Sequence, residues 1–202
     1  MRHRVVNDFS LVNALLGMAM RRTANSEATR LFRASRSRIR VIALFHAFAW
    51  RGDGPLNAAD TRAYFEQLVG EAVRSHDTGD RIVAELETND TTLGLSEIVA
   101  VALCVNELLG NALDHAFPDD RRGHVRVTLA HEGDEVQVRV TDDGIGMSDA
   151  SRDETQGLGL PLVRLLAEQL SATIVLDSSE RHGTDFCLRF PSTEESRAWQ
   201  TS

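Results

Sequence analysis

The chain has 202 residues, a formal net charge of −8 at pH 7 and 42% hydrophobic residues. These values are typical of a globular protein with one large domain or two small ones. Because an acidic chain is a poor electrostatic match for nucleic acids or anionic lipids and no nucleic-acid motif is present, we expect no nucleic-acid partner.

No continuous apolar run approaches the roughly 20 residues of a membrane span, so we expect no membrane insertion in this chain. The first residues also lack the apolar core of a secretory signal. Cys104 and Cys187 lie inside apolar stretches, which indicates buried thiols in a reducing compartment and predicts a cytoplasmic protein. The chain contains no lysine, so all 22 of its Lys+Arg residues are arginine.

The first 50 residues have the pattern of two helices. Apolar residues recur at helical spacing from Val5 to Ala19, and after a polar break a second apolar stripe runs to Trp50. Asn25 or Ser26 is a suitable N-cap for the second helix. The resulting antiparallel hairpin has an apolar stripe on each helix. A second copy of the chain, in a four-helix bundle, or the rest of this chain can cover these stripes.

After a turn rich in glycine and proline, the pattern changes to mixed helices and strands. We predict helices over residues 58–75, 96–116 and 157–170, and strands over 81–86, 124–130, 135–141, 173–176 and 185–190. Helices mixed with a mostly antiparallel sheet indicate an α+β layer fold. We therefore expect a helical hairpin over 1–52, an α+β domain over 56–192 and a polar tail over 193–202.

The long predicted helix carries three polar residues that could bind a metal and phosphates. Glu107, Asn111 and His115 stand at i, i+4 and i+8, so they share one helix face. The Asn111 amide oxygen is a candidate Mg²⁺ ligand, and Glu107 can orient a water or a hydroxyl. A solvated helix face would explain the same three residues.

A second cluster, Asp142-Asp143-Gly144-Ile145-Gly146, directly follows a predicted strand. Asp142 can accept a hydrogen bond from an exocyclic amine such as that of adenine. Gly144 and Gly146 would let the backbone approach a flat base, because neither has a Cβ. Taken alone, the pentapeptide is also an ordinary turn.

Two further clusters contain glycines. Gly157 and Gly159 stand at the start of a predicted helix, where backbone amides make a favourable site for phosphates. Thr184 opens the last predicted strand, and its hydroxyl can reach a phosphate or stabilise a turn.

In this order, the four clusters resemble the N, G1, G2 and G3 boxes of the GHKL (Bergerat) ATP-binding fold, whose members include the histidine kinases. The resemblance covers about Leu56 to Pro191 and implies an α/β sandwich that binds Mg-ATP. It implies Asn111 as the Mg²⁺ ligand and Glu107 as a catalytic carboxylate. It also implies nucleotide contacts from Asn111, His115, Asp142, Gly144, Gly146, Gly157, Gly159 and Thr184.

The hairpin points to a subfamily, because His3-Arg4-Val5-Val6-Asn7 resembles the His-Arg-x-x-Asn signature of HRxxN-type sensor kinases, relatives of the HWE kinases. This resemblance implies that His3 accepts the γ-phosphoryl group and passes it to a response-regulator aspartate, in a homodimer joined through the hairpin. Asn7, one turn along, can orient the ring, and Arg4 can pair with phosphoryl oxygens. His46 is an alternative acceptor, although its apolar neighbours favour a buried structural histidine.

The chain departs from the family pattern at several positions. Asp114 stands where the family often has lysine, and the short lid between the G1 and G2 clusters is acidic, with Asp149, Asp153 and Glu154. These changes weaken the expectation of fast autophosphorylation more than that of ATP binding. Met1 is only two residues before His3, so we expect either a kinase without its own sensor domain or a fragment of a longer protein.

Two other functions compete with the kinase interpretation. A histidine phosphotransferase, or a regulator-binding phosphatase or scaffold on a kinase-like frame, would turn over little or no ATP. Asp114 favours this alternative, whereas the intact Asp142, Gly144 and Gly146 oppose it. A serine-phosphorylating anti-sigma kinase of the GHKL class is the third possibility, but it would not need the helical hairpin.

Overall fold

The computed structural model describes residues 2–49, 57–76, 78–89, 91–147, 158–179 and 182–193, with side chains from residue 7 onward. The chain divides into two compact units, Met1–Pro55 and Leu56–Ser202.

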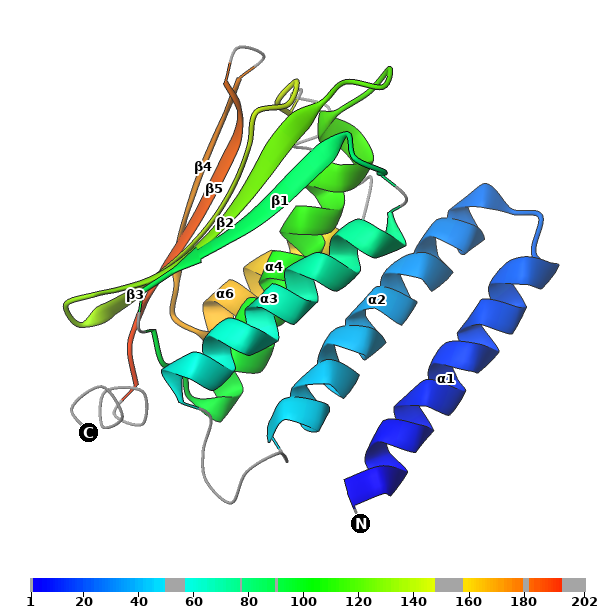
Figure 1. Ribbon diagram of the computed structural model, residues 1–202, viewed down its shortest axis with the longest axis horizontal. Helices are drawn as coiled ribbons and strands as arrows, with labels where there is room; N and C mark the ends of the chain where they lie inside the picture. The colour runs from blue at the N-terminus through cyan, green and yellow to red at the C-terminus, as the bar shows by residue number, and fades with distance from the viewer. Residues whose placement is uncertain are drawn as a thin grey trace. The chain divides into compact units, whose positions relative to one another are not determined.

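The first unit is an antiparallel pair of helices, α1 (Arg2–Arg22) and α2 (Ser26–Ala49), which lie side by side (Figure 1). Asn25 caps α2, because its Oδ1 accepts a hydrogen bond from the Ala28 backbone N–H at 3.0 Å. Gly17 on α1 is buried, and a Cβ there would lie 3.4 Å from Cζ of Arg36 on α2. The predicted helical hairpin and the Asn25 cap are therefore confirmed.

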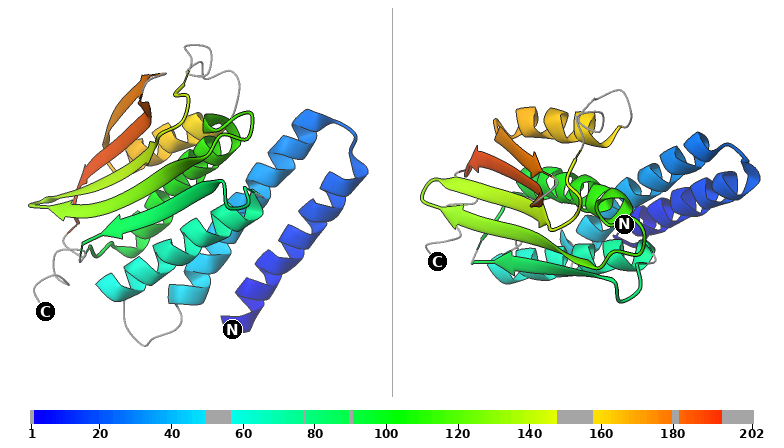
Figure 2. Two further views of the ribbon diagram at one scale, coloured as in Figure 1. Left: turned by 45° about the horizontal axis from the view of Figure 1, so that its top comes forward. Right: turned by 90° about the horizontal axis from the view of Figure 1, so that it is seen from above.

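In its described residues, the second unit is a two-layer α/β sandwich, in which helices α3, α4 and α6 cover one face of a five-stranded sheet (Figure 2). The strand order is β1-β2-β3-β5-β4, with β1 parallel to β2 and all other neighbours antiparallel. The strands are β1 (Ile82–Thr88), β2 (Gly123–Glu132), β3 (Glu135–Asp142), β4 (Thr173–Ser179) and β5 (Gly183–Pro191). The main helices are α3 (Ala58–Ser75), α4 (Leu95–Asn111) and α6 (Gly159–Gln169). The α+β prediction is confirmed, and every strand continues past its predicted C-terminal end, although β1 begins one residue later than predicted.

The core of this unit lies between α4 and the inner face of the sheet. Alternate residues of β2 are almost fully buried, as are residues along α4, namely Val125, Val127, Leu129, Ile98, Val101 and Val105. Each such aliphatic side chain contributes about 1.5–3 kcal/mol of hydrophobic stabilisation. By length and composition alone the segment Leu95–Ala116 could cross a membrane, but 67% of its most apolar window is buried inside the protein, as expected for a central helix.

A buried carboxylate joins the start of α4 to the end of β5. Glu97 is only 2% exposed, and its Oε2 accepts a hydrogen bond from the Gly94 backbone N–H at 2.6 Å. Its other oxygen, Oε1, accepts from the Thr193 backbone N–H at 3.0 Å. Glu97 thus satisfies one orphan donor at the helix start and fixes the chain as it leaves the last strand.

The end of the long helix differs from the sequence prediction. Regular α-helix ends at Asn111, and residues Ala112–Ala116 form a π-helical turn, η1. A π turn hydrogen-bonds from i to i+5, so it is wider and rotates less per residue, roughly 85° instead of about 100°. The prediction of one uninterrupted α-helix over 96–116 is therefore wrong in its last turn, which carries Asp114 and His115.

Candidate functional site

Asp142 is a buried carboxylate at the end of β3, and only 9% of its surface is exposed. Its Oδ1 accepts hydrogen bonds from two backbone N–H groups, those of Gly144 at 2.9 Å and Thr184 at 3.2 Å. Burial raises the pKa of Asp142 above its ordinary value, and hydrogen bonds from Gly144 and Thr184 only partly offset this rise. A carboxylate held in this way has a fixed orientation, as recognition of a specific donor requires.

The glycines after Asp142 are packed against neighbouring backbone. A Cβ on Gly144 would lie 2.4 Å from the carbonyl oxygen of Ala116, which also accepts a hydrogen bond from the Ile145 N–H at 3.0 Å. Gly146 has a φ of +70°, and its Cβ would lie 2.5 Å from the Ser179 carbonyl oxygen. Both positions therefore require glycine because the loop packs closely against neighbouring backbone. This requirement holds whether or not a base also approaches the loop.

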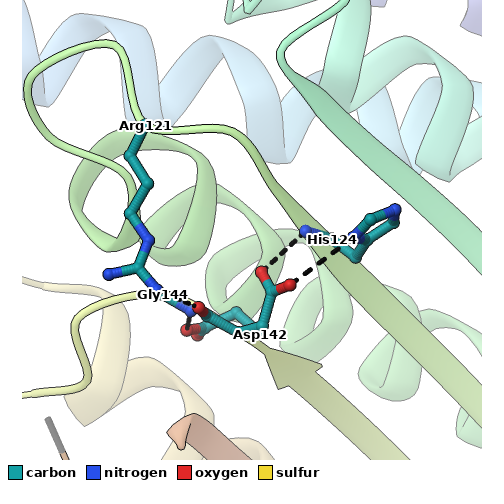
Figure 3. A network of polar contacts seen from close by, with 5 residues as sticks. Arg121, His124, Asp142 and Gly144 are labelled. Carbon is teal, nitrogen blue, oxygen red and sulfur yellow. Dashed lines mark hydrogen bonds and ion pairs between the residues drawn. The ribbon is translucent and has the colours of Figure 1, made fainter. Parts of the chain in front are cut away.

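A polar network fixes the same loop from its exposed side (Figure 3). The Asp143 side chain accepts a hydrogen bond from the His124 backbone N–H at 2.7 Å. The Asp143 backbone carbonyl accepts a hydrogen bond from Nη2 of Arg121 at 2.8 Å. The His124 ring nitrogen Nδ1 lies 3.4 Å from the Asp143 carboxylate. Sequence reasoning missed His124 and singled out Arg121 only as a nearby cation, because both roles depend on tertiary contacts with Asp143 that no local motif marks.

A second group of predicted residues meets where α6 begins. Glu107 is 8% exposed, and a Cβ on Gly159 would lie 3.2 Å from Glu107 Oε2 and 3.8 Å from the side-chain amide of Asn111. Asn106 donates a hydrogen bond to Glu107 Oε1 at 3.1 Å. The structure therefore brings Glu107, Asn111 and Gly159 together from two elements that are far apart in the sequence.

The remaining predicted residues of this unit are distributed around these two groups. Thr184 lies beside Asp142, and its hydroxyl is 3.3 Å from Ser178 Oγ, which also accepts a hydrogen bond from the Met147 N–H at 2.7 Å. Ser178 was missed by the sequence analysis, because a serine in a strand carries no distinctive signal. His115 is exposed in η1, and Gly157 lies outside the described residues.

In the helical unit, His3 and Arg4 lie in the first turn of α1, and their side chains are outside the described part of the chain. Asn7 is exposed one turn further along. His46 is half-buried, and its ring centroid lies 5.5 Å from that of Phe9 and 5.7 Å from that of Phe45. These aromatic contacts agree with a structural role for His46.

Two family models together match most of the chain. The HATPase_c model, described as "Histidine kinase-, DNA gyrase B-, and HSP90-like ATPase", matches residues 96–194. The HisKA_2 model, described as "Histidine kinase", matches residues 1–76.

Curated relatives include the sensor histidine kinase PdtaS of Mycobacterium tuberculosis (strain CDC 1551), which is 31% identical over 195 residues, 94% of this chain and 38% of that protein. PdtaS of Mycolicibacterium smegmatis is 31% identical over 207 residues, 98% of this chain and 40% of that protein. The chain therefore spans about two-fifths of the length of these relatives.

Solved structures share the fold at low sequence identity. The histidine kinase domain from Erythrobacter litoralis EL346 blue-light activated histidine kinase has a TM-score of 0.71 and 19% identity, covering 96% of this chain and 97% of that one. The Acinetobacter baumannii histidine kinase AdeS has a TM-score of 0.56 and 12% identity, covering 95% and 97%. These comparisons confirm the resemblance noted in the sequence. The chain belongs to the histidine kinases, with a HisKA_2 segment followed by a GHKL-type ATPase domain.

Proposed function

We propose that this chain is the ATP-dependent protein-histidine kinase core of a two-component system. It binds Mg-ATP in the C-terminal unit, phosphorylates His3 and passes the phosphoryl group to an aspartate of a response-regulator receiver domain. The observation that carries the proposal is that one domain brings Asp142 together with Thr184, and Glu107 together with Asn111 and Gly159.

Asp142 is the candidate for base recognition. Because backbone N–H groups of Gly144 and Thr184 hold Oδ1, the carboxylate is oriented before the ligand arrives. A buried carboxylate accepts a hydrogen bond from the exocyclic amine of adenine, whereas it repels the carbonyl that guanine has at the equivalent position. This arrangement favours ATP over GTP.

The residues around Gly159 fit a phosphate and magnesium site. Asn111 offers an oxygen ligand of the kind that Mg²⁺ prefers, and the start of α6 offers backbone N–H groups to phosphates. Among the described residues no group of three or more His, Cys, Asp or Glu side chains could hold a metal by itself. A magnesium ion here would therefore share its ligands with the phosphates, and when bound it would neutralise and orient them.

The chemical step needs a nucleophile, an orienting group and compensation of phosphoryl charge. A nitrogen of the His3 imidazole attacks the γ-phosphorus, the bond to the bridging oxygen breaks, and ADP leaves with that oxygen. Asn7 orients the ring, Arg4 pairs with the phosphoryl oxygens, and the buried Glu107 carboxylate orients the attacking group or a water. The phosphoramidate then transfers its phosphoryl group to the receiver aspartate.

The hairpin surface suits two protein partners. Leu11, Leu15 and Met18 are 46–61% exposed at helical spacing on α1, an apolar stripe that a second copy would cover in a homodimeric four-helix bundle. Nine arginines but only two acidic residues precede position 50, so the hairpin attracts an acidic receiver domain.

The buried free thiols support a cytoplasmic location.

Labelling with γ-³²P-ATP tests the proposal. We expect an acid-labile label that is lost in His3→Ala, while ATP affinity measured by calorimetry is retained. His46→Ala is the matched control, because it removes the other histidine near this end of the hairpin and should keep the label. An acid-stable label would instead indicate a serine kinase.

The specific observation in favour of a phosphotransferase or scaffold is the carboxylate of Asp114, which lies in η1, the turn that directly follows Asn111 of α4. In that case the chain would accept a phosphoryl group from a phosphorylated regulator but would not be labelled by ATP.

A further inference from the structure

Asp114 poses an electrostatic problem for the proposed nucleotide site. In a continuous α-helix it would follow Glu107 by two turns and Asn111 by nearly one, so its carboxylate would share their face. That face is the one proposed for magnesium and phosphates. An unscreened carboxylate there would repel the triphosphate.

The π turn changes which side chain occupies that face. With roughly 85° per residue after Asn111, position 114 is rotated by about 45° from its α-helical place, toward the side of Gly110. Position 115, by the same geometry, comes back to within about 20° of Asn111. The wide turn η1 therefore moves Asp114 off the proposed phosphate face, whereas His115 stays on it.

A histidine at the end of α3 meets Asp114 on the Gly110 side. His76 Nε2 lies 3.7 Å from Asp114 Oδ1, and the His76 side chain is only 13% exposed, against 43% for Asp114. A Cβ on Gly110 would lie 3.8 Å from the same His76 nitrogen, so the ring packs over a residue without a side chain.

The other ring nitrogen anchors His76 to its own helix. Nδ1 lies 2.7 Å from the carbonyl oxygen of Ala72, and because a carbonyl can only accept, Nδ1 carries a proton. Nε2 faces the Asp114 carboxylate in a half-buried setting, with the geometry of an ion pair.

We propose that His76 is a positioning residue of the nucleotide site. It holds the Asp114 carboxylate on the Gly110 side of the helix and offsets its negative charge, so that ATP binds although an acidic residue stands in the last helical turn. This inference rests on the proposed function.

Calorimetric affinities for Mg-ATP and for adenosine test the role of His76. We expect His76→Ala to weaken Mg-ATP binding by roughly three- to tenfold and to change adenosine binding by less than about twofold, because adenosine has no phosphates for Asp114 to repel. In the His76→Ala background, Asp114→Asn should restore Mg-ATP affinity. The loss of Mg-ATP affinity should also be smaller in 0.5 M salt, because the Debye length is then only about 4 Å and salt screens the Asp114 carboxylate from the phosphates. If His76→Ala does not fold, His76→Gln, whose amide keeps an N–H donor, replaces it in the same affinity measurements.

Three results would overturn the proposal: unchanged Mg-ATP affinity in His76→Ala, parallel losses of Mg-ATP and adenosine binding, or no rescue by Asp114→Asn. A wild-type chain that binds no ATP would overturn the proposed function and the screening role with it. Strictly additive shifts of unfolding temperature for His76→Ala, Asp114→Asn and their combination would overturn the His76–Asp114 contact alone.

Discussion

Oδ1 of Asp142, at the end of β3, accepts a hydrogen bond from the backbone N–H of Thr184, at the start of β5, over 3.2 Å. This bond joins two neighbouring strands at the proposed base-binding position. Because the carboxylate is buried, its pKa is raised above the ordinary value, and its ionised form is disfavoured in the folded chain. The residue proposed to recognise the base therefore costs stability when it is charged.

The first prediction concerns Asp142→Asn. A carboxyl whose pKa is higher in the folded than in the unfolded chain favours folding only while it is protonated, and this contribution is lost as pH rises through the folded pKa. An amide keeps the Oδ1 acceptor without the charge. We expect the variant to have a higher free energy of unfolding than the wild type at pH 7, with the gain shrinking as pH falls toward about 4.

Urea unfolding at the two pH values measures this gain, and calorimetry should show ATP affinity lowered by at least about tenfold. Asp143→Asn is the control, because that carboxylate is 58% exposed and should give no comparable gain. A less stable Asp142→Asn variant with normal ATP binding would contradict the assignment.

The second prediction compares two glycines with positive φ. Gly183 has a φ of +74°, and a Cβ there would lie 2.0 Å from the Asp142 carbonyl oxygen, whereas Gly133, with a φ of +63°, has no atom within 4 Å of that position. Both alanine variants incur a conformational cost of about 1 kcal/mol. We expect Gly183→Ala to lose roughly 2–3 kcal/mol more than Gly133→Ala in denaturant unfolding, together with ATP binding. Equal losses would show that β5 can move away from β3.

The third prediction concerns the thiols. Cys104 is 1% exposed, and burial, together with the nearby negative charge of Glu107, raises its pKa to about 12. Cys187 is also buried, on β5. We expect neither thiol to react rapidly with Ellman's reagent at pH 8 in the native protein, and both to react in 8 M urea. Fast labelling of the native chain would mean that α4, which carries Cys104, or β5, which carries Cys187, opens locally.

The fourth prediction concerns Glu97, which bonds the N–H groups of Gly94 and Thr193 from a buried position. Removal of its side chain leaves two donors without their acceptor. We expect Glu97→Ala to lower the free energy of unfolding by about 2–4 kcal/mol. Glu168→Ala, on the exposed side of α6, should change it by less than about 0.5 kcal/mol. Similar losses in the two variants would refute the anchoring role.

Local signals in the sequence were sufficient for most elements. The alternation of Val125, Val127 and Leu129 predicts β2, and the Asp-Gly cluster correctly predicts that a strand ends at Asp142. Strand ends were less predictable, because β4 continues to Ser179 only through its pairing with β5. Such pairing is a tertiary effect that a single strand does not encode.

The π turn and the His76–Asp114 contact were beyond sequence reasoning. Residues 112–116 have the same apolar spacing in either kind of helix, so periodicity cannot distinguish them. His76 stands 38 positions before Asp114, at the end of another helix, and no local pattern links the two. By contrast, glycines required by close packing, such as Gly144, were visible in the sequence, although the cause is the Ala116 backbone as well as any ligand.

The position of β5 in the sheet has a consequence for how the protein matures during synthesis. β5 is the last strand among the described residues, yet it lies between β3 and β4. When β4 leaves the ribosome it has no neighbour to bond with, and Asp142 still lacks the Thr184 N–H that orients it. The proposed base-binding position is therefore complete only when β5 is inserted, so we expect a nascent chain not to bind nucleotide before its sheet is complete.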